Sequence, residues 1–288
     1  MGIDFIFKVG LKKIIFQFMI RKFKQSKFKY DLLTARHRLF QRLTKKPNIK
    51  DATISDLFIW INNNEFDTQY VFVNLEKLLQ VQKKDNCETE YMVVFFNEFG
   101  EQIRKVKLNI KEAYERISLG SIINTHGKGT FCIFSKFNPE NYGYESECFF
   151  TERGYISYVL KGTSKKFHIH GNIDAIASNS AGQIEPLSAI SLFKRFFYPQ
   201  VIVGPNETIS CYVTNPTKKK LSISFMVFDN QSIEFYKEDT KIFSLAYKEF
   251  TYKNNTDSFL RISIKSRLIM ARPIVHVVSK NFHDFFHA

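Results

Sequence analysis

From residue 57 onward the chain is divided into short runs in which apolar side chains recur at every second position. A period of two is typical of β-strands that turn alternate residues toward a core. Turn signals such as Asn97-Glu98-Phe99-Gly100 and Gly204-Pro205-Asn206 separate the runs. Many short strands with few helical segments predict antiparallel β-sandwiches. The predicted strands are 57–61, 70–73, 90–96, 102–108, 130–134, 155–160, 166–170, 201–203, 208–214, 220–228, 233–236, 241–246, 259–264 and 274–278.

Two segments of this strand-rich region resemble each other. Residues 91–117 can be laid on residues 224–250, because both give an apolar strand, a polar turn, a second strand and the pattern Ala-Tyr-Glu or Ala-Tyr-Lys. Upstream, YVFVN at 70–74 matches CYVTN at 211–215. This similarity predicts two copies of one sandwich. With a polar linker at 48–56, the predicted organisation is a leader at 1–47, a first sandwich at 48–190 and a second at 191–288.

The second half carries a family resemblance. The segment VIVGPNETISCYVTNPTKKKLSISFMVF, residues 201–228, resembles the opening hairpin of immunoglobulin-like β-sandwich modules. The resemblance extends over about 80 residues and implies the fold, together with a role in adhesion, scaffolding or carbohydrate contact. It supplies no catalytic residue.

A second resemblance is to uncharacterised bacterial proteins encoded beside surface-polysaccharide genes, which implies an accessory role in surface-glycan assembly. The residues that carry it are Arg153-Gly154-Tyr155, His170-Gly171-Asn172, Ser266-Arg267-Leu268, Arg272-Pro273 and the segment from Asp284 to His287.

The excess positive charge is confined to the first sixth of the chain. Residues 1–50 hold 14 Lys and Arg against two acids, so this leader carries +12 of the formal net charge of +14. A basic amphipathic helix is predicted over 3–25 and a second helix over 31–46. The large apolar face of the first favours contact with an anionic membrane surface. The predicted membrane-contact residues are Lys8, Lys12, Lys13, Arg21, Lys22 and Lys24.

Other partners for the leader stay open. Its apolar face can equally pack on the protein's own body or on a partner protein. Nucleic acid is the least favoured partner, because the other 238 residues carry only +2 and offer no extended basic groove. No apolar run reaches the ~18 residues that a membrane-spanning helix needs.

The densest cluster of polar candidates is residues 162–182. On a strand, His168 and His170 would face the same side, with Asp174 four residues later. The spacing Gly162-x5-His168-x-His170-x3-Asp174 resembles the first metal motif of cupins, with Asp174 in place of Glu. The resemblance to their second motif fails, because Cys211-x3-Asn215 stands where a histidine is needed. A histidine pair with a structural or ligand-binding role is favoured over a metal site, and Asn172 is a further candidate ligand-binding residue.

The C-terminus supplies further candidate ligand-binding residues. His283 and His287 are predicted to lie one helical turn apart. Arg267 and Arg272 flank an apolar run and could form an anion site with His276. A loop carrying His170 and Asn172 could meet Arg272 between the two sandwiches, where pockets commonly form.

Several common metal-binding, redox and catalytic motifs are absent from the sequence. The four cysteines are separated by 45, 16 and 63 positions, which excludes a CxxC pair and favours buried thiols in a reducing cytosol. Phosphate-loop, dinucleotide, GxSxG and HExxH motifs are absent from the sequence. We therefore expect a non-catalytic binding or accessory protein, cytoplasmic or at the membrane periphery, without a cofactor. The alternative is an enzyme acting on a sugar or small molecule through His168, His170 and Asp174.

Overall fold

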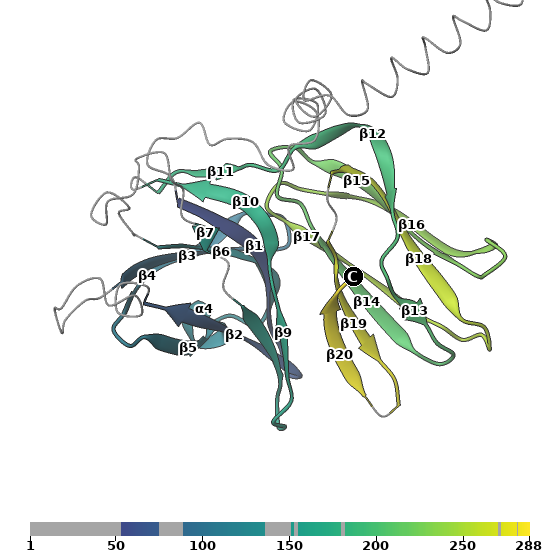
Figure 1. Cartoon of the computed structure of the whole chain (residues 1–288), viewed down its shortest axis with the longest axis horizontal. Helices are drawn as coiled ribbons and strands as arrows, with labels where there is room; N and C mark the ends of the chain where they lie inside the picture. The colour runs from purple at the N-terminus through teal and green to yellow at the C-terminus, as the bar shows by residue number, and fades with distance from the viewer. Residues whose placement is uncertain are drawn as a thin grey trace, which may run out of the picture. The chain divides into compact units, whose positions relative to one another are not determined.

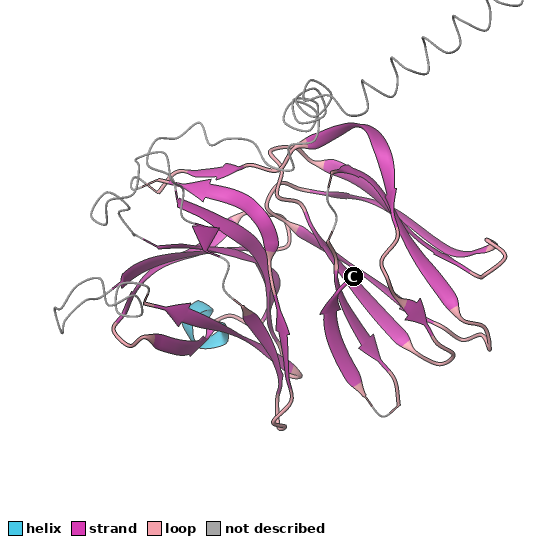
Figure 2. Cartoon of the chain, in the orientation of Figure 1, coloured by secondary structure: helices cyan, strands magenta, loops and turns pink. Residues whose placement is uncertain are grey.

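The computed structural model describes residues 53–74, 89–135, 151–152, 155–179, 182–269, 272–280 and 282–288. Over these residues the chain is mainly β, as predicted, with one short helix, α4 (Leu119–Ile123) (Figure 1, Figure 2). The predicted leader helices and the six membrane-contact side chains lie outside the described residues. None of the helices in the described part is long and apolar enough to cross a membrane.

The N-terminal part forms two layers, which we call the N-terminal sheet pair. One layer has the order β4 (Gln102–Ile110), β3 (Thr89–Phe96), β6 (Gly127–Ser135), β1 (Thr53–Asn62). The other has the order β5 (Tyr114–Ser118), β2 (Phe66–Val73), β8 (Ile156–Leu160), β9 (Lys166–Ile169). The two layers are joined at the bridge between Asn62 and Asp67. Strands β7 (Thr151–Glu152), β10 (Asn172–Ser178) and β11 (Ile184–Pro186) continue the sheet beside the first half of β1.

The C-terminal part repeats this order, and we call it the C-terminal sheet pair. Its first layer has the order β16 (Glu234–Ile242), β15 (Leu221–Phe228), β18 (Leu260–Leu268), β12 (Ile190–Phe197), with β13 (Ile202–Val203) also paired to β18. Its second layer has the order β17 (Tyr247–Lys253), β14 (Thr208–Thr214), β19 (Ile274–Val278), β20 (His283–His287). All of these pairings are antiparallel.

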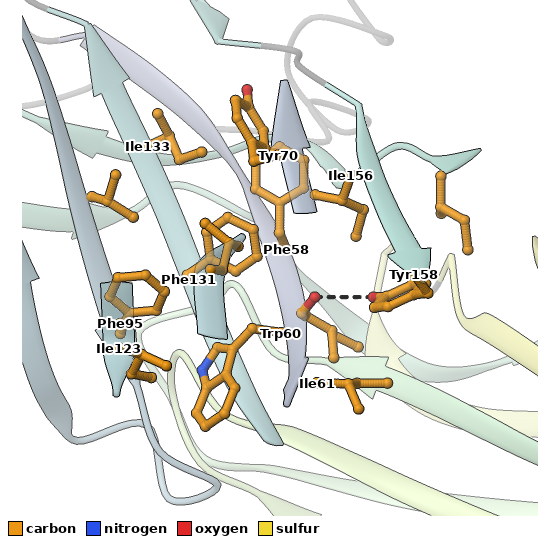
Figure 3. Close-up of a cluster of buried hydrophobic side chains, with 14 of the residues drawn as sticks. Phe58, Trp60, Ile61, Tyr70, Phe95, Ile123, Phe131, Ile133, Ile156 and Tyr158 are labelled. Carbon is orange, nitrogen blue, oxygen red and sulfur yellow. Dashed lines mark hydrogen bonds between the residues drawn. The ribbon is translucent and has the colours of Figure 1, made fainter. Parts of the chain in front are cut away.

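The core of the N-terminal sheet pair is largely aromatic (Figure 3). Phe131 stacks between Phe58 and Phe95, with ring centroids 5.1 and 5.8 Å away. The hydroxyl of Tyr158 on β8 donates to the carbonyl oxygen of Ile59 on β1 at 3.0 Å, which ties one layer to the other (Figure 3). Aromatic side chains bury large apolar areas, so the many Phe and Tyr residues of this sequence supply much of the buried apolar surface of this core.

Strands β1, β3 and β6 are buried on both faces. Their second face carries Val94, Phe96, Cys132 and Phe134, which pack against Ala175 and Ile176 of β10 and against Leu245 of the C-terminal sheet pair. A strand covered on both sides needs apolar residues at consecutive positions. This explains why LFIWI, MVVFF and FCIF are continuous apolar runs rather than alternating ones.

The two predicted similar segments form hairpins of the same construction. Strands β3 and β4 begin 132 positions before β15 and β16, and both pairs have a bulge just before the turn. In one turn Asn97 Oδ1 accepts from the amides of Phe99 and Glu101. In the other Asp229 Oδ1 accepts from the amides of Gln231 and Ile233. The strands align at a separation of 132 rather than the 133 that the sequence match suggested.

A buried asparagine occupies the same place in both sheet pairs. Asn74 Nδ2 donates to the carbonyl of Ile110 at the end of β4, at 3.0 Å. Asn215 Nδ2 donates to the carbonyl of Ile242 at the end of β16, also at 3.0 Å. Both side chains are fully buried. Each asparagine thus fixes the end of a hairpin to the strand that precedes it.

Several predicted strand limits differ from those observed. β1 begins at Thr53, inside the predicted linker, and β16 runs unbroken to Ile242 where two strands were predicted. β12 was missed because most of its side chains are exposed, so that no alternation marks it. The sequence prediction also missed strands β5, β10, β17 and β20.

Candidate functional site at the seam

The N-terminal sheet pair contacts the C-terminal sheet pair along a continuous set of residues that we call the seam. At its centre Lys128 on β6 reaches across to Glu249 on β17, with Nζ 2.7 Å from Oε2 and 2.9 Å from Oε1. The same ammonium donates to the Tyr212 hydroxyl at 3.3 Å. The Lys128 and Glu249 side chains are 25% and 27% exposed. This ion pair is therefore more shielded from solvent than an ordinary surface pair.

The charges at the centre of the seam act on a nearby phenol. Burial, followed by the negative charge and hydrogen bonding of Glu249, raises the pKa of Tyr212. The phenol stays protonated and can accept the hydrogen bond from Lys128. Gly129, beside Lys128, has no room for a side chain, because a Cβ would collide with the carbonyl of Phe96 and the indole of Trp60.

Aromatic and imidazole rings fill the next part of the seam. Phe285 on β20 stacks on Tyr158 of β8 at 4.6 Å and lies 5.5 Å from Phe167 of β9, measured between ring centroids. On its other side Phe285 is parallel to His276 of β19 at 4.1 Å. Phe66 meets both His276 and Phe285 edge-on. These ring contacts connect strands β8 and β9 with strands β19 and β20.

Two imidazoles in this cluster share a hydrogen bond. His276 Nε2 and His283 Nδ1 lie 3.3 Å apart, and His283 Nδ1 lies 3.6 Å from Glu65 Oε1. Burial lowers the pKa of His276 to about 4, with smaller contributions from the charges of His283 and Lys128. His276 is therefore neutral at pH 7, and its ring serves as a flat packing surface.

The C-terminal end of the seam joins two of the predicted site residues. The imidazole Nε2 of His287 contacts the carbonyl oxygen of His170, and the His170 ring lies 4.1 Å from that of Tyr155. Burial lowers the pKa of His287, and the positive charge of Arg272 lowers it further. The structure thus brings His170, Arg272 and His287 into one neighbourhood.

At the opposite end, a turn of each sheet pair touches the other. The Thr130 hydroxyl donates to the carbonyl of Leu245, and the rings of Phe99 and Phe243 lie 6.3 Å apart. Gly100 has a φ of 78°, and a Cβ there would collide with the carbonyl oxygen of Ser244. Sequence reasoning named Gly100 only as a turn residue, and nothing in the pattern pointed to this contact.

His168 and Arg267 make contacts of their own elsewhere. His168 is exposed on β9 and its Nδ1 is 2.8 Å from the Ser157 hydroxyl. Arg267 is exposed on β18 and donates to the carbonyl of Ser191 at 2.7 Å. The side chains of Asn172 and Asp174 lie outside the described residues. Among the side chains that are described, no three His, Cys, Asp or Glu are grouped so as to hold a metal ion.

Two geometric expectations need correction. His283 and His287 are at the two ends of strand β20, because residues 283–287 are extended and pair with β19. They are not one helical turn apart. Arg267 projects from the first layer of the C-terminal sheet pair, whereas His276 projects from the second layer into the seam. An anion site containing both is therefore not assembled.

The cysteines that the structure describes lie in the core. Cys132 and Cys211 are free and fully buried, in the apolar strands that predicted buried thiols. Burial raises the pKa of both thiols, which keeps them protonated.

No family model matches the chain, and no curated protein matches it. Among solved structures, a beta-glucuronidase from glycoside hydrolase family 2 has a TM-score of 0.16 and 8% identity, covering 85% of this chain and 24% of that one. The Bacteroides uniformis beta-glucuronidase 2 has a TM-score of 0.15 and 9% identity, covering 81% of this chain and 25% of that one. The chain spans about a quarter of the length of either enzyme. Likenesses at these TM-scores carry no argument about fold or function.

Proposed function

We propose that this chain is a non-catalytic binding or accessory protein built from two tandem immunoglobulin-like β-sandwiches, residues 48–190 and 191–288. The identical strand order of the two sheet pairs and the matching roles of Asn74 and Asn215 support a duplicated module. In this proposal the seam holds the two modules as one unit, and the outer sheet faces meet the partner.

One observation carries the proposal: the seam uses its titratable side chains for packing. His276 packs against the rings of Phe66 and Phe285, and Lys128 is paired with Glu249. A general acid or base needs access to a substrate proton, and His276 is only 7% exposed. This arrangement favours a structural role for the seam. The alternative function is an enzyme acting on a sugar or small molecule through His168, His170 and Asp174.

Chemical unfolding followed by two probes tests whether the two sheet pairs form one cooperative unit. Trp60 is the only tryptophan of the chain and is buried in the N-terminal sheet pair, so its fluorescence reports on that pair. Far-ultraviolet circular dichroism reports on the strands of both pairs. We expect the two urea transitions to coincide. Two separate midpoints would mean independent modules and would contradict a fixed unit.

The leader is proposed to attach this unit to an anionic membrane surface or to a partner protein, on the cytoplasmic side, with surface-glycan assembly as the setting. The support is its charge of +12 beside large apolar residues. Flotation of the full chain with phosphatidylglycerol vesicles tests the membrane arm. A variant with glutamine in place of six basic residues should not float. These residues are Lys8, Lys12, Lys13, Arg21, Lys22 and Lys24. If the full chain stays at the bottom of the gradient, the membrane is excluded as the target of the leader, and a partner protein is the target left to test.

A further inference from the structure

The outer face of the layer β12-β18-β15-β16 contains a hollow of about 810 Å³. It forms because small side chains of β15 lie between longer side chains on the neighbouring strands. Ser224 on β15 is registered with Lys265 on β18 and with Asp239 on β16, and Lys265 is registered with Phe196 on β12. Ser222 lies two residues before Ser224 on the same face of β15 and is registered with Lys241 on β16, so its small side chain extends the hollow.

The hollow carries a positive charge. Four lysines line it, Lys194, Lys237, Lys241 and Lys265, against the two carboxylates of Glu234 and Asp239. The net charge of its lining is therefore +2. Lys237 is paired with Asp239 at 3.2 Å. For the other three lysines, no described carboxylate lies within ion-pair distance. These ammonium groups are available to an anionic ligand.

Flat apolar surface adjoins these charges. The rings of Phe196 and Tyr198 are stacked, with centroids 6.2 Å apart and an angle of 11° between their planes. They remain 50% and 65% exposed. The Lys265 ammonium lies 4.7 Å from the centroid of the Phe196 ring. The hollow thus joins hydroxyl groups, carboxylates, cations and aromatic rings, a mixture typical of a site that orients a polar ligand.

We propose that this hollow binds an acidic polysaccharide whose sugar rings carry carboxylates. This inference rests on the proposed binding function and names its ligand class. The lysines neutralise the carboxylates, Ser222 and Asp239 exchange hydrogen bonds with sugar hydroxyls, and the Tyr198 ring packs on the apolar face of a sugar.

Two features favour this ligand over other polyanions. Single-stranded nucleic acid needs successive open aromatic faces for base stacking, but Lys265 covers the Phe196 ring and leaves the Tyr198 ring as the single open face of this stacked pair beside the hollow. Asp239 and Glu234 would also repel closely spaced phosphates, whereas they can accept from sugar hydroxyls. The protein's own leader is disfavoured as an occupant, because its charge of +12 has the same sign as the hollow.

The test is a titration of the full chain by calorimetry at low and moderate salt. The probes are oligogalacturonate, a neutral cello-oligosaccharide and an oligo-dT of matched charge. We expect oligogalacturonate to bind, with an affinity that falls as salt rises, and the other two to bind at least tenfold more weakly. Lys194→Gln with Lys241→Gln should weaken oligogalacturonate binding at least fivefold, since both side chains are exposed at the hollow.

Matched variants separate the hollow from the rest of the chain. Lys105→Gln with Lys166→Gln removes the same charge from exposed positions of the N-terminal sheet pair and should change the affinity less than twofold. Lys8→Gln, Lys12→Gln and Lys13→Gln test the leader. If only the leader variant weakens binding, if oligo-dT binds as well as the uronate, or if no probe binds, the hollow is not an acidic-polysaccharide site. Release of shorter uronates during the titration would instead contradict the non-catalytic function.

Discussion

The imidazole of His276 lies parallel to the ring of Phe285, with the centroids 4.1 Å apart and an angle of 5° between the planes. One residue comes from β19 and the other from β20, and together they face the aromatic side chains of β2, β8 and β9. A protonated imidazole would lose hydration there. The groups facing it are His283, Lys128 and, through His283, the carboxylate of Glu65.

Stability should therefore fall as the pH falls through the range between the unfolded and folded pKa values of His276. The unfolded pKa is near 6.5 and the folded pKa is about 4. Between these values the unfolded chain takes up a proton that the folded chain does not, which costs about 3 kcal/mol when complete. The lowered pKa of His287 acts in the same direction. Urea midpoints measured at pH 7, 5.5 and 4.5 check this.

The variant His276→Phe keeps a flat ring and removes the proton site. It should flatten the dependence of the urea midpoint on pH between 7 and 4.5. His168→Phe is the matched control, because His168 is exposed on β9 and should leave the pH dependence as it is. An unchanged slope in the His276 variant would show that the acid sensitivity arises elsewhere.

The pair of Lys128 and Glu249 should contribute measurably to stability. A double-mutant cycle with Lys128→Met and Glu249→Gln is expected to give a coupling free energy of about 1 kcal/mol or more, because both groups are three-quarters buried and bonded at two atoms. The exposed pair Lys237 and Asp239 is the control and should give a clearly smaller coupling, because solvent screens its charges. Equal couplings would mean that the seam provides no shielding.

Gly100→Ala should destabilise the protein more than Gly162→Ala. Both glycines have a positive φ, 78° and 76°, so both variants strain the backbone by about 1 kcal/mol. Only at Gly100 would the new methyl group collide with Ser244 across the seam, whereas Gly162 has open space around it. We expect at least about 1 kcal/mol of additional loss, measured by urea unfolding with Trp60 fluorescence. Equal losses would argue against a tight contact at this turn.

The alternation of apolar residues was enough to predict a mainly β fold, because a strand with one solvent-facing side must alternate. β14 and β19 were placed at their observed limits. β12 escaped prediction because Leu192, Phe193 and Phe196 are exposed, so its pattern does not distinguish a core face. The C-terminal segment was taken as helical from the spacing of two histidines, although pairing with β19 decides its conformation.

The seam was harder to predict from the sequence, because its contacts join residues that are far apart in the chain. Lys128 and Glu249 are 121 positions apart, and neither belongs to a motif. Gly129 did carry a signal, since glycine is favoured where a backbone or a ring approaches the chain closely. The segment Gly127-Lys128-Gly129 forms the start of β6.

Asn74→Ala and Asn215→Ala should destabilise the chain by similar amounts. Each side chain is fully buried and donates to the last carbonyl of a hairpin, so its removal loses a buried hydrogen bond at a cost of about 2 kcal/mol. Asn230→Ala, at an exposed turn, should stay within about 0.5 kcal/mol of the parent. Urea unfolding measures all three. A loss at one buried asparagine only would show that the two hairpin ends, although built alike, do not depend equally on this bond, and would weaken the case for a duplicated module.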